Sequence, residues 1–192
     1  VRFKISDKGS SYVTQEMPDV LRSGSVDFRP IDIKFGPDGA LYIADWSNPI
    51  IQHGEVDFRD DRRDHENGRI WRISAKGKPP LKAPPIRSAT VAQLLKNLES
   101  PEPWVVSMSK RVLIERGHDV LAPVLDWERG LEGEHAEALR LHALWLHVGL
   151  HRVERDVLQR CLTADDARVR AAAIRVGRHW LDQLPNAVEM LA

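Results

Sequence analysis

Cysteine is almost absent from this sequence of 192 residues, since Cys161 is the only one. A single cysteine excludes an intrachain disulfide, a cysteine-rich zinc site and a C-x-x-C-H haem attachment within the chain. It does not fix the redox compartment. With no evident base partner, Cys161 is expected to be a small core residue.

Net charge of either sign is also missing, because 28 Lys and Arg balance 28 Asp and Glu. No global field would concentrate nucleic acid or anionic lipid on the protein, so no nucleic-acid partner is expected. No apolar run approaches the roughly 20 residues of a membrane span, so no span is expected in this chain. The hydrophobic fraction of 42% predicts folded domains rather than disorder.

An initiator methionine and a basic-then-apolar leader are absent as well, because the sequence starts at Val1. This start is typical of a processed or excised piece. We therefore expect a fragment of a larger protein, and the absent leader says little about where the parent protein resides.

The first half of the chain reads as β, because residues 1–5 and 31–35 alternate apolar and polar positions with the period of a half-buried strand. Strands are expected at residues 1–5, 31–35, 40–44 and 69–73. The run Gly36-Pro37-Asp38-Gly39 is a strong turn signal and predicts a hairpin between the second and third of these. About four short antiparallel strands are the content of one β-propeller blade, which is the fold expected here.

Residues 75–88 contain four prolines and one glycine, which predict a semi-rigid linker and a domain boundary. Residues 89–192 then carry apolar residues at helical spacing. Helices are expected after Thr90 and at residues 103–116, 119–127, 134–148, 153–162 and 165–184, with Asp165 and Asp166 at the start of the last.

The predicted helices look repetitive, because the segment around Arg140 resembles the segment around Arg170. Small residues after each arginine would let neighbouring helices approach closely. This pattern predicts HEAT-like helical repeats, an α-solenoid. The expected class is therefore α+β: one antiparallel blade-like sheet followed by helical repeats. The tryptophans of the repeats are expected to pack in the core: Trp104, Trp127, Trp145 and Trp180. The histidines of the repeats are expected to be solvated or packed: His142, His147 and His151.

A long loop, residues 45–68, separates two of the predicted strands and mixes apolar anchors with charges. Loops of this length are usually functional or disordered, and this composition predicts an ordered one. Its potential metal ligands are Asp45, Asn48, His53, Glu55, Asp57, Asp60, Asp61, Asp64 and His65. Imidazole with carboxylate suits zinc, manganese or iron, and oxygen ligands alone suit calcium.

Two interpretations of this loop stay open. His53 or His65 is a candidate general base, and Asp64, His65 and His53 are candidate metal ligands. Alternatively, residues 60–63 form a salt-bridged surface turn, and Asp45 and Asp64 cap backbone amides. No strict metal motif such as H-E-x-x-H decides between the two.

Several segments of the first half resemble one known group of proteins. Residues 28–46 resemble the final-blade pattern of glucose/sorbosone dehydrogenase-like propellers. Residues 48–53 and 59–73 are similar to the large membrane-bound dehydrogenases of the planctomycete and verrucomicrobial type. In that family a β-propeller precedes HEAT-like repeats and often a c-type cytochrome domain, and the present order of parts matches it.

The resemblance implies a periplasmic or exported oxidoreductase that acts on sugars or related alcohols. It also implies pyrroloquinoline quinone with calcium in the parent protein and haem c in an appended domain. This chain would be the C-terminal portion with the last blade, inactive by itself. The alternative is a non-enzymatic scaffold, in which the helical repeats bind a protein partner and the blade is a docking platform.

Overall fold

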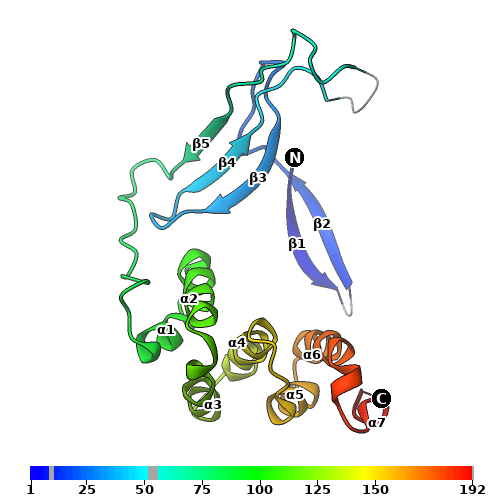
Figure 1. Ribbon diagram of the computed structural model, residues 1–192. Helices are drawn as coiled ribbons and strands as arrows, with labels where there is room; N and C mark the ends of the chain where they lie inside the picture. The colour runs from blue at the N-terminus through cyan, green and yellow to red at the C-terminus, as the bar shows by residue number, and fades with distance from the viewer. Residues whose placement is uncertain (9–10, 52–55, 192) are drawn as a thin grey trace. The chain divides into compact units, whose positions relative to one another are not determined.

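The computed structural model describes residues 1–8, 11–51 and 56–191. The chain divides into two compact units, Val1–Lys82 and Ala83–Ala192. The first holds every described strand and the second every described helix (Figure 1). The expected mixed α+β class is confirmed.

The β unit contains five described strands in two antiparallel sheets. A hairpin pairs β1 (Arg2–Lys8) with β2 (Ser11–Met17). A second sheet has the order β3 (Pro30–Phe35), β4 (Leu41–Asp45), β5 (Arg69–Ile73). The expectation of about four strands was therefore too low, because β2 escaped the sequence pattern and pairs with β1 alone along its whole length.

The predicted turn between β3 and β4 is confirmed. The Gly36 amide donates to the Ala40 carbonyl at 2.9 Å, and the Gly39 amide to the Gly36 carbonyl at 3.1 Å. Gly39 has a φ of 74°, the left-handed region that glycine adopts without strain. A Cβ on Gly39 would also lie 2.7 Å from Leu81 Cδ1, so the end of the Leu81 side chain would have to shift.

One face of the second sheet is apolar. The register places Ile33, Ile43 and Trp71 in one row and Phe35, Leu41 and Ile73 in the next. The opposite face carries Asp32, Lys34, Tyr42 and Arg72, with Ala44 and Ile70 among them. Ile43, at the centre of the apolar face, is buried, but Ile33 and Phe35 on β3 are 55% and 53% exposed.

The proline-rich segment packs at its start on the β unit and at its end on the helical unit. The Leu81 amide donates to the Asp38 carbonyl at 3.0 Å, so residues up to 81 fold back on the β3–β4 turn. Ile86 and Ala89 belong to the buried core of the helical unit. The stretch between these attachments is therefore only residues 82–85, shorter than the predicted linker 75–88.

The helical unit contains seven described α-helices: α1 (Val91–Asn97), α2 (Pro103–Glu115), α3 (Leu121–Arg129), α4 (Ala136–Gly149), α5 (Arg155–Leu162), α6 (Ala167–His179) and α7 (Ala187–Leu191). Two 3-10 turns, η1 (Gly117–Val120) and η2 (Leu181–Gln183), precede α3 and follow α6. Asp166 caps α6, as the sequence predicts, and α1 begins after Thr90, as expected. Thr90 also forms a capping box, which the sequence analysis did not predict. The helix expected at 165–184 was wrong at its end, because the chain turns through η2 and Asn186, which has a φ of 58°.

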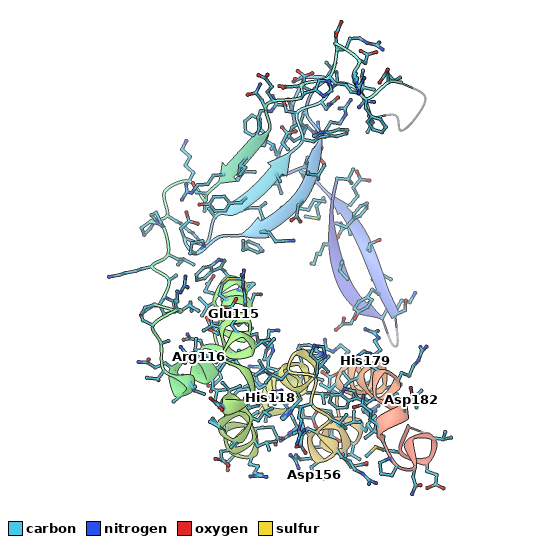
Figure 2. All side chains as sticks on the ribbon, viewed as in Figure 1. Glu115, Arg116, His118, Asp156, His179 and Asp182 are labelled. Carbon is cyan, nitrogen blue, oxygen red and sulfur yellow. The ribbon has the colours of Figure 1, made fainter. Side chains whose placement is uncertain are left out.

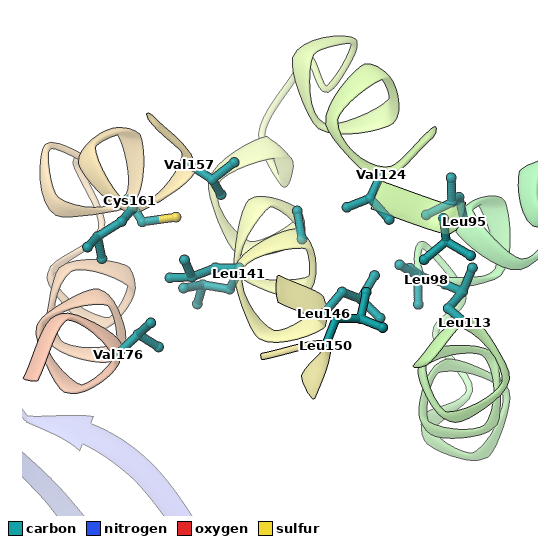
Figure 3. Packing of buried hydrophobic residues seen from close by; sticks show 14 of the residues in the cluster. Leu95, Leu98, Leu113, Val124, Leu141, Leu146, Leu150, Val157, Cys161 and Val176 are labelled. Carbon is teal, nitrogen blue, oxygen red and sulfur yellow. The ribbon is translucent and has the colours of Figure 1, made fainter. Parts of the chain in front are cut away.

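The helices pack as two layers. Figure 1 shows α2, α4 and α6 along one side of the helical unit, with α3 and α5 along the other. Leucine and valine side chains fill the space between the layers (Figure 3). Ala143 and Ala173, each three residues after a repeated arginine, are fully buried. Close approach of the helices at these residues stays a prediction.

The aromatic and sulfur side chains follow the sequence interpretation except at one position. Trp180 and Cys161 are buried, and burial raises the pKa of the Cys161 thiol to about 11. Trp104 and Trp127 pack against the core. Trp145 was predicted to pack inward but is 39% exposed, and the Lys110 ammonium lies 4.9 Å from its ring centroid.

A buried carboxylate ties three helices together. The Glu128 side chain on α3 is fully buried and accepts hydrogen bonds from Arg140 Nε on α4 at 2.6 Å and from Arg160 on α5 at 2.6 and 2.9 Å. Burial alone would raise the Glu128 pKa, but the two guanidinium groups outweigh it and lower the pKa. The carboxylate is therefore ionised and held from two sides.

Glu128→Gln should destabilise the helical unit by about 3 kcal/mol, because two guanidinium groups lose their buried counter-charge. Urea unfolding followed by circular dichroism at 222 nm measures the change. Asp126→Asn is the matched control, since Asp126 is exposed on the same helix beside Arg129. Equal unfolding midpoints for Glu128→Gln and wild type would contradict the prediction.

His147 on α4 predicts a pH dependence of stability. Its side chain is 1% exposed, and neither ring nitrogen has a hydrogen-bond partner within the described residues. Burial and the charge of Arg152 lower its pKa, while Glu154 and Glu128 act in the opposite direction. The folded protein therefore holds a neutral imidazole, whereas the unfolded chain takes up a proton near pH 6.5.

Because the unfolded state binds more protons below about pH 6.5, stability should fall as the pH drops from 7.5 to 5.5. The share from His147 is up to about 1 kcal/mol. His147→Leu should reduce this pH dependence, and His151→Gln, at an exposed position, should not. Thermal unfolding at the two pH values measures both, and an unchanged slope in His147→Leu would refute the assignment.

Candidate functional site

The candidate site is the loop of residues 46–68 that joins β4 to β5. His53, proposed as base and metal ligand, and Glu55 lie outside the described residues. The other candidates are described. Their side chains show how the loop is held.

Asp45 ends β4, and its side chain is fully buried. Oδ1 accepts from the Arg29 amide at 2.7 Å and the Ser47 amide at 3.1 Å. Oδ2 accepts from Arg69 Nε at 2.9 Å and Trp71 Nε1 at 2.8 Å. Burial would raise the Asp45 pKa, but these donors outweigh it and lower the pKa. With four donors on two oxygens, Asp45 anchors the chain and has no oxygen left for a metal.

Five side chains of this region form the same local turn. In each, a side-chain oxygen accepts the backbone amide two residues further on, at 2.9 to 3.1 Å. This arrangement is an Asx turn. The five residues are Asp45, Asn48, Asp57, Asp60 and Asp64. The acidic residues that suggested a ligand set therefore shape the loop backbone.

Asp64 and His65 are adjacent but differ in their surroundings. The Asp64 carboxylate accepts the Glu66 amide at 3.0 Å and the Asn67 amide at 2.9 Å, and these bonds lower its pKa. His65 is exposed. Within the described parts of the chain, no three His, Cys, Asp or Glu side chains gather as a metal site would require. The role of His53 as a third ligand or as a base stays a prediction.

The predicted salt-bridged turn at residues 60–63 is confirmed, since both Asp60 oxygens accept from the Arg62 guanidinium at 2.8 Å. The buried position of Arg63 was not predicted from the sequence. Its side chain is 6% exposed and donates to the carbonyls of Asp57, Ile50 and Val56. Its guanidinium also lies 5.6 Å from the Phe58 ring centroid. Arg63 therefore connects described parts of the loop by donating to their backbone carbonyls.

Part of the chain matches a known family. Residues 1–77 match a family described as a domain of unknown function (DUF7133). The match covers all five described strands and the 46–68 loop, and it ends before the helical unit begins. No curated protein and no solved structure matched the chain. Among the described residues, no helix has the length and hydropathy to cross a membrane.

Asp45→Asn should loosen the loop and the end of the sheet, because one oxygen and one NH2 group replace a carboxylate that faces four donors. The expected loss is about 2 kcal/mol of local stability. Hydrogen exchange of peptides from residues 41–51 and 56–73, followed by mass spectrometry, measures it. Asp61→Asn, an exposed position in the same loop, should leave exchange unchanged. Equal protection in the two variants would refute the anchoring role.

Proposed function

We propose that this chain is the C-terminal portion of a propeller-type sugar or alcohol dehydrogenase and is inactive by itself. In this proposal the sheet β3-β4-β5 belongs to a propeller blade and the helical unit is a HEAT-like α-solenoid. The observation that carries the proposal is the exposed apolar face of the sheet. The resemblance of residues 28–73 to dehydrogenase propellers supplies the reaction class and the periplasmic or exported location.

The apolar face is costly to leave in water. Ile33 and Phe35 on β3 are more than half exposed, and Trp71 on β5, on the other side of the buried Ile43, is 36% exposed. Burying a side chain of this kind contributes about 1.5–3 kcal/mol. Contiguous apolar patches on a folded protein mark interaction surfaces. A second sheet is the natural cover, because sheets pack face to face about 10 Å apart through such rows of side chains.

The edges of the sheet support the same conclusion. β3 and β5 are the outer strands, and in the described chain neither pairs with a further strand. Unpaired edges and an uncovered face together are a hazard in a free domain. Neighbouring blades of a propeller would cover the face and protect the edges.

The described residues do not fit a quinone or calcium site of their own. The carboxylates of Asp45, Asp57, Asp60 and Asp64 already accept backbone amides. The proposal therefore assigns no cofactor to this chain. His53 and His65 remain candidate bases, because an imidazole could take a proton from a substrate hydroxyl.

The test is dye-linked oxidation of aldoses and alcohols by the full-length enzyme that contains this chain. Substrate-dependent dye reduction is expected, and this chain alone should give none. Ile33→Asp with Phe35→Asp should abolish activity, because two charges would be buried between blades. Asp32→Ala with Lys34→Ala, on the opposite face of the same strand, should retain most of it.

Circular dichroism checks that both double variants of the isolated chain fold, since all four side chains are exposed there. Full activity in the Ile33→Asp, Phe35→Asp enzyme would refute docking of this face. Absence of any sugar or alcohol oxidation would refute the reaction class. An unchanged kcat in both His53→Ala and His65→Ala enzymes would remove the catalytic assignment of these histidines.

A further inference from the structure

A groove in the helical unit has a chemical character that the proposed oxidation does not use. It lies at the N-terminal ends of α2 and α4, between the end of α1 and the α3–α4 connection, and has a volume of about 490 Å³. Leu98, Val106 and Leu139 give it an apolar lining. Three carboxylates share the lining: Glu99, Glu132 and Glu134.

The charge of the groove is negative. Glu99 is paired with Lys96. Glu132 and Glu134 are exposed, and neither forms a hydrogen bond or ion pair with another described residue. His142 also lines the groove, but burial and the nearby Lys110 lower its pKa to about 4, so it adds no positive charge at neutral pH. Two uncompensated carboxylates therefore border an apolar floor.

The two carboxylates and the apolar floor together determine which kind of ligand fits the groove. A bare metal ion does not fit, since the described residues offer no cluster of three ligands and the floor is apolar. The volume lies within the range of sites that hold a few side chains. Stacked helix pairs present extended surfaces that suit an extended segment. The complementary group is a cation on an apolar stem, as in lysine or arginine, next to an apolar residue.

We propose that this groove binds an extended cationic segment of a partner protein, with an apolar side chain on Leu98, Val106 and Leu139 and a lysine or arginine beside Glu132 and Glu134. This interaction does not depend on the oxidoreductase proposal, because it needs neither a redox centre nor further sheets. The ammonium or guanidinium contacts would be solvent-exposed, so binding should weaken as the ionic strength rises.

The probe is a fluorescein-labelled dodecapeptide of alternating lysine and leucine, titrated with the whole chain and followed by fluorescence anisotropy. Its counterpart of alternating glutamate and leucine should not bind. Ala138→Arg places a cation in the groove at an exposed helical position and should weaken binding at least about ten-fold. Glu132→Gln with Glu134→Gln should weaken it about three- to ten-fold.

Two matched controls separate the groove from general charge effects. Ala92→Arg adds the same cation at an exposed position of α1 outside the groove lining. Asp182→Asn with Glu189→Gln removes the same charge at the C-terminal end of the unit, where Figure 2 labels Asp182. Both controls should bind like wild type. Absence of lysine–leucine peptide binding, or equal binding by Ala138→Arg and Ala92→Arg, would overturn the proposal whatever the enzyme assay shows.

Discussion

A buried carboxylate must have its lone pairs filled by donors, and this requirement organises both units of the chain. Asp45 meets it with four donors from three segments: the approach to β3, the turn after β4, and β5. Glu128 meets it with two arginines from two helices. Because an unpaired buried charge costs several kcal/mol, each carboxylate permits only the arrangement that brings its donors together. In each unit this carboxylate therefore restricts how the elements around it can pack.

The same requirement decides the chemistry of the long loop. A carboxylate oxygen that accepts a backbone amide offers fewer lone pairs to a metal ion. The Asx turns of Asp57, Asp60 and Asp64 therefore define the backbone path and leave these carboxylates fewer lone pairs for a metal ion. Arg63 completes that path by donating to carbonyls that would otherwise face the loop interior without a partner. The acidic residues of such a loop hold its backbone in place and do not by themselves indicate a metal site. A histidine in the loop could still be positioned by this backbone.

Features that depend on neighbours in sequence were predictable, and features that depend on distant partners were not. The Gly36–Gly39 turn and the caps at Thr90 and Asp166 follow from local backbone preferences, and all three are present. In the loop, each Asp or Asn could have been predicted to accept the amide two residues further on. The sequence analysis instead treated these residues as possible metal ligands. The partners of Glu128 and Arg63 could not be predicted, since their donors and acceptors come from other helices or from the far side of the loop. Separate pairing of β1 with β2 depends equally on which strands meet.

The two proposed surfaces differ in how their partners would associate. Ile33 and Phe35 expose mainly apolar area, which is typical of an obligate interface that stays buried once it has formed. The groove instead carries exposed carboxylates, which keep it hydrated when it is empty and make its binding sensitive to salt. An exposed apolar sheet face is typically buried against further parts of the same fold, whereas a hydrated acidic groove can bind and release a partner. The sheet therefore suits permanent neighbours of the same protein, and the helical unit suits a partner that binds and leaves.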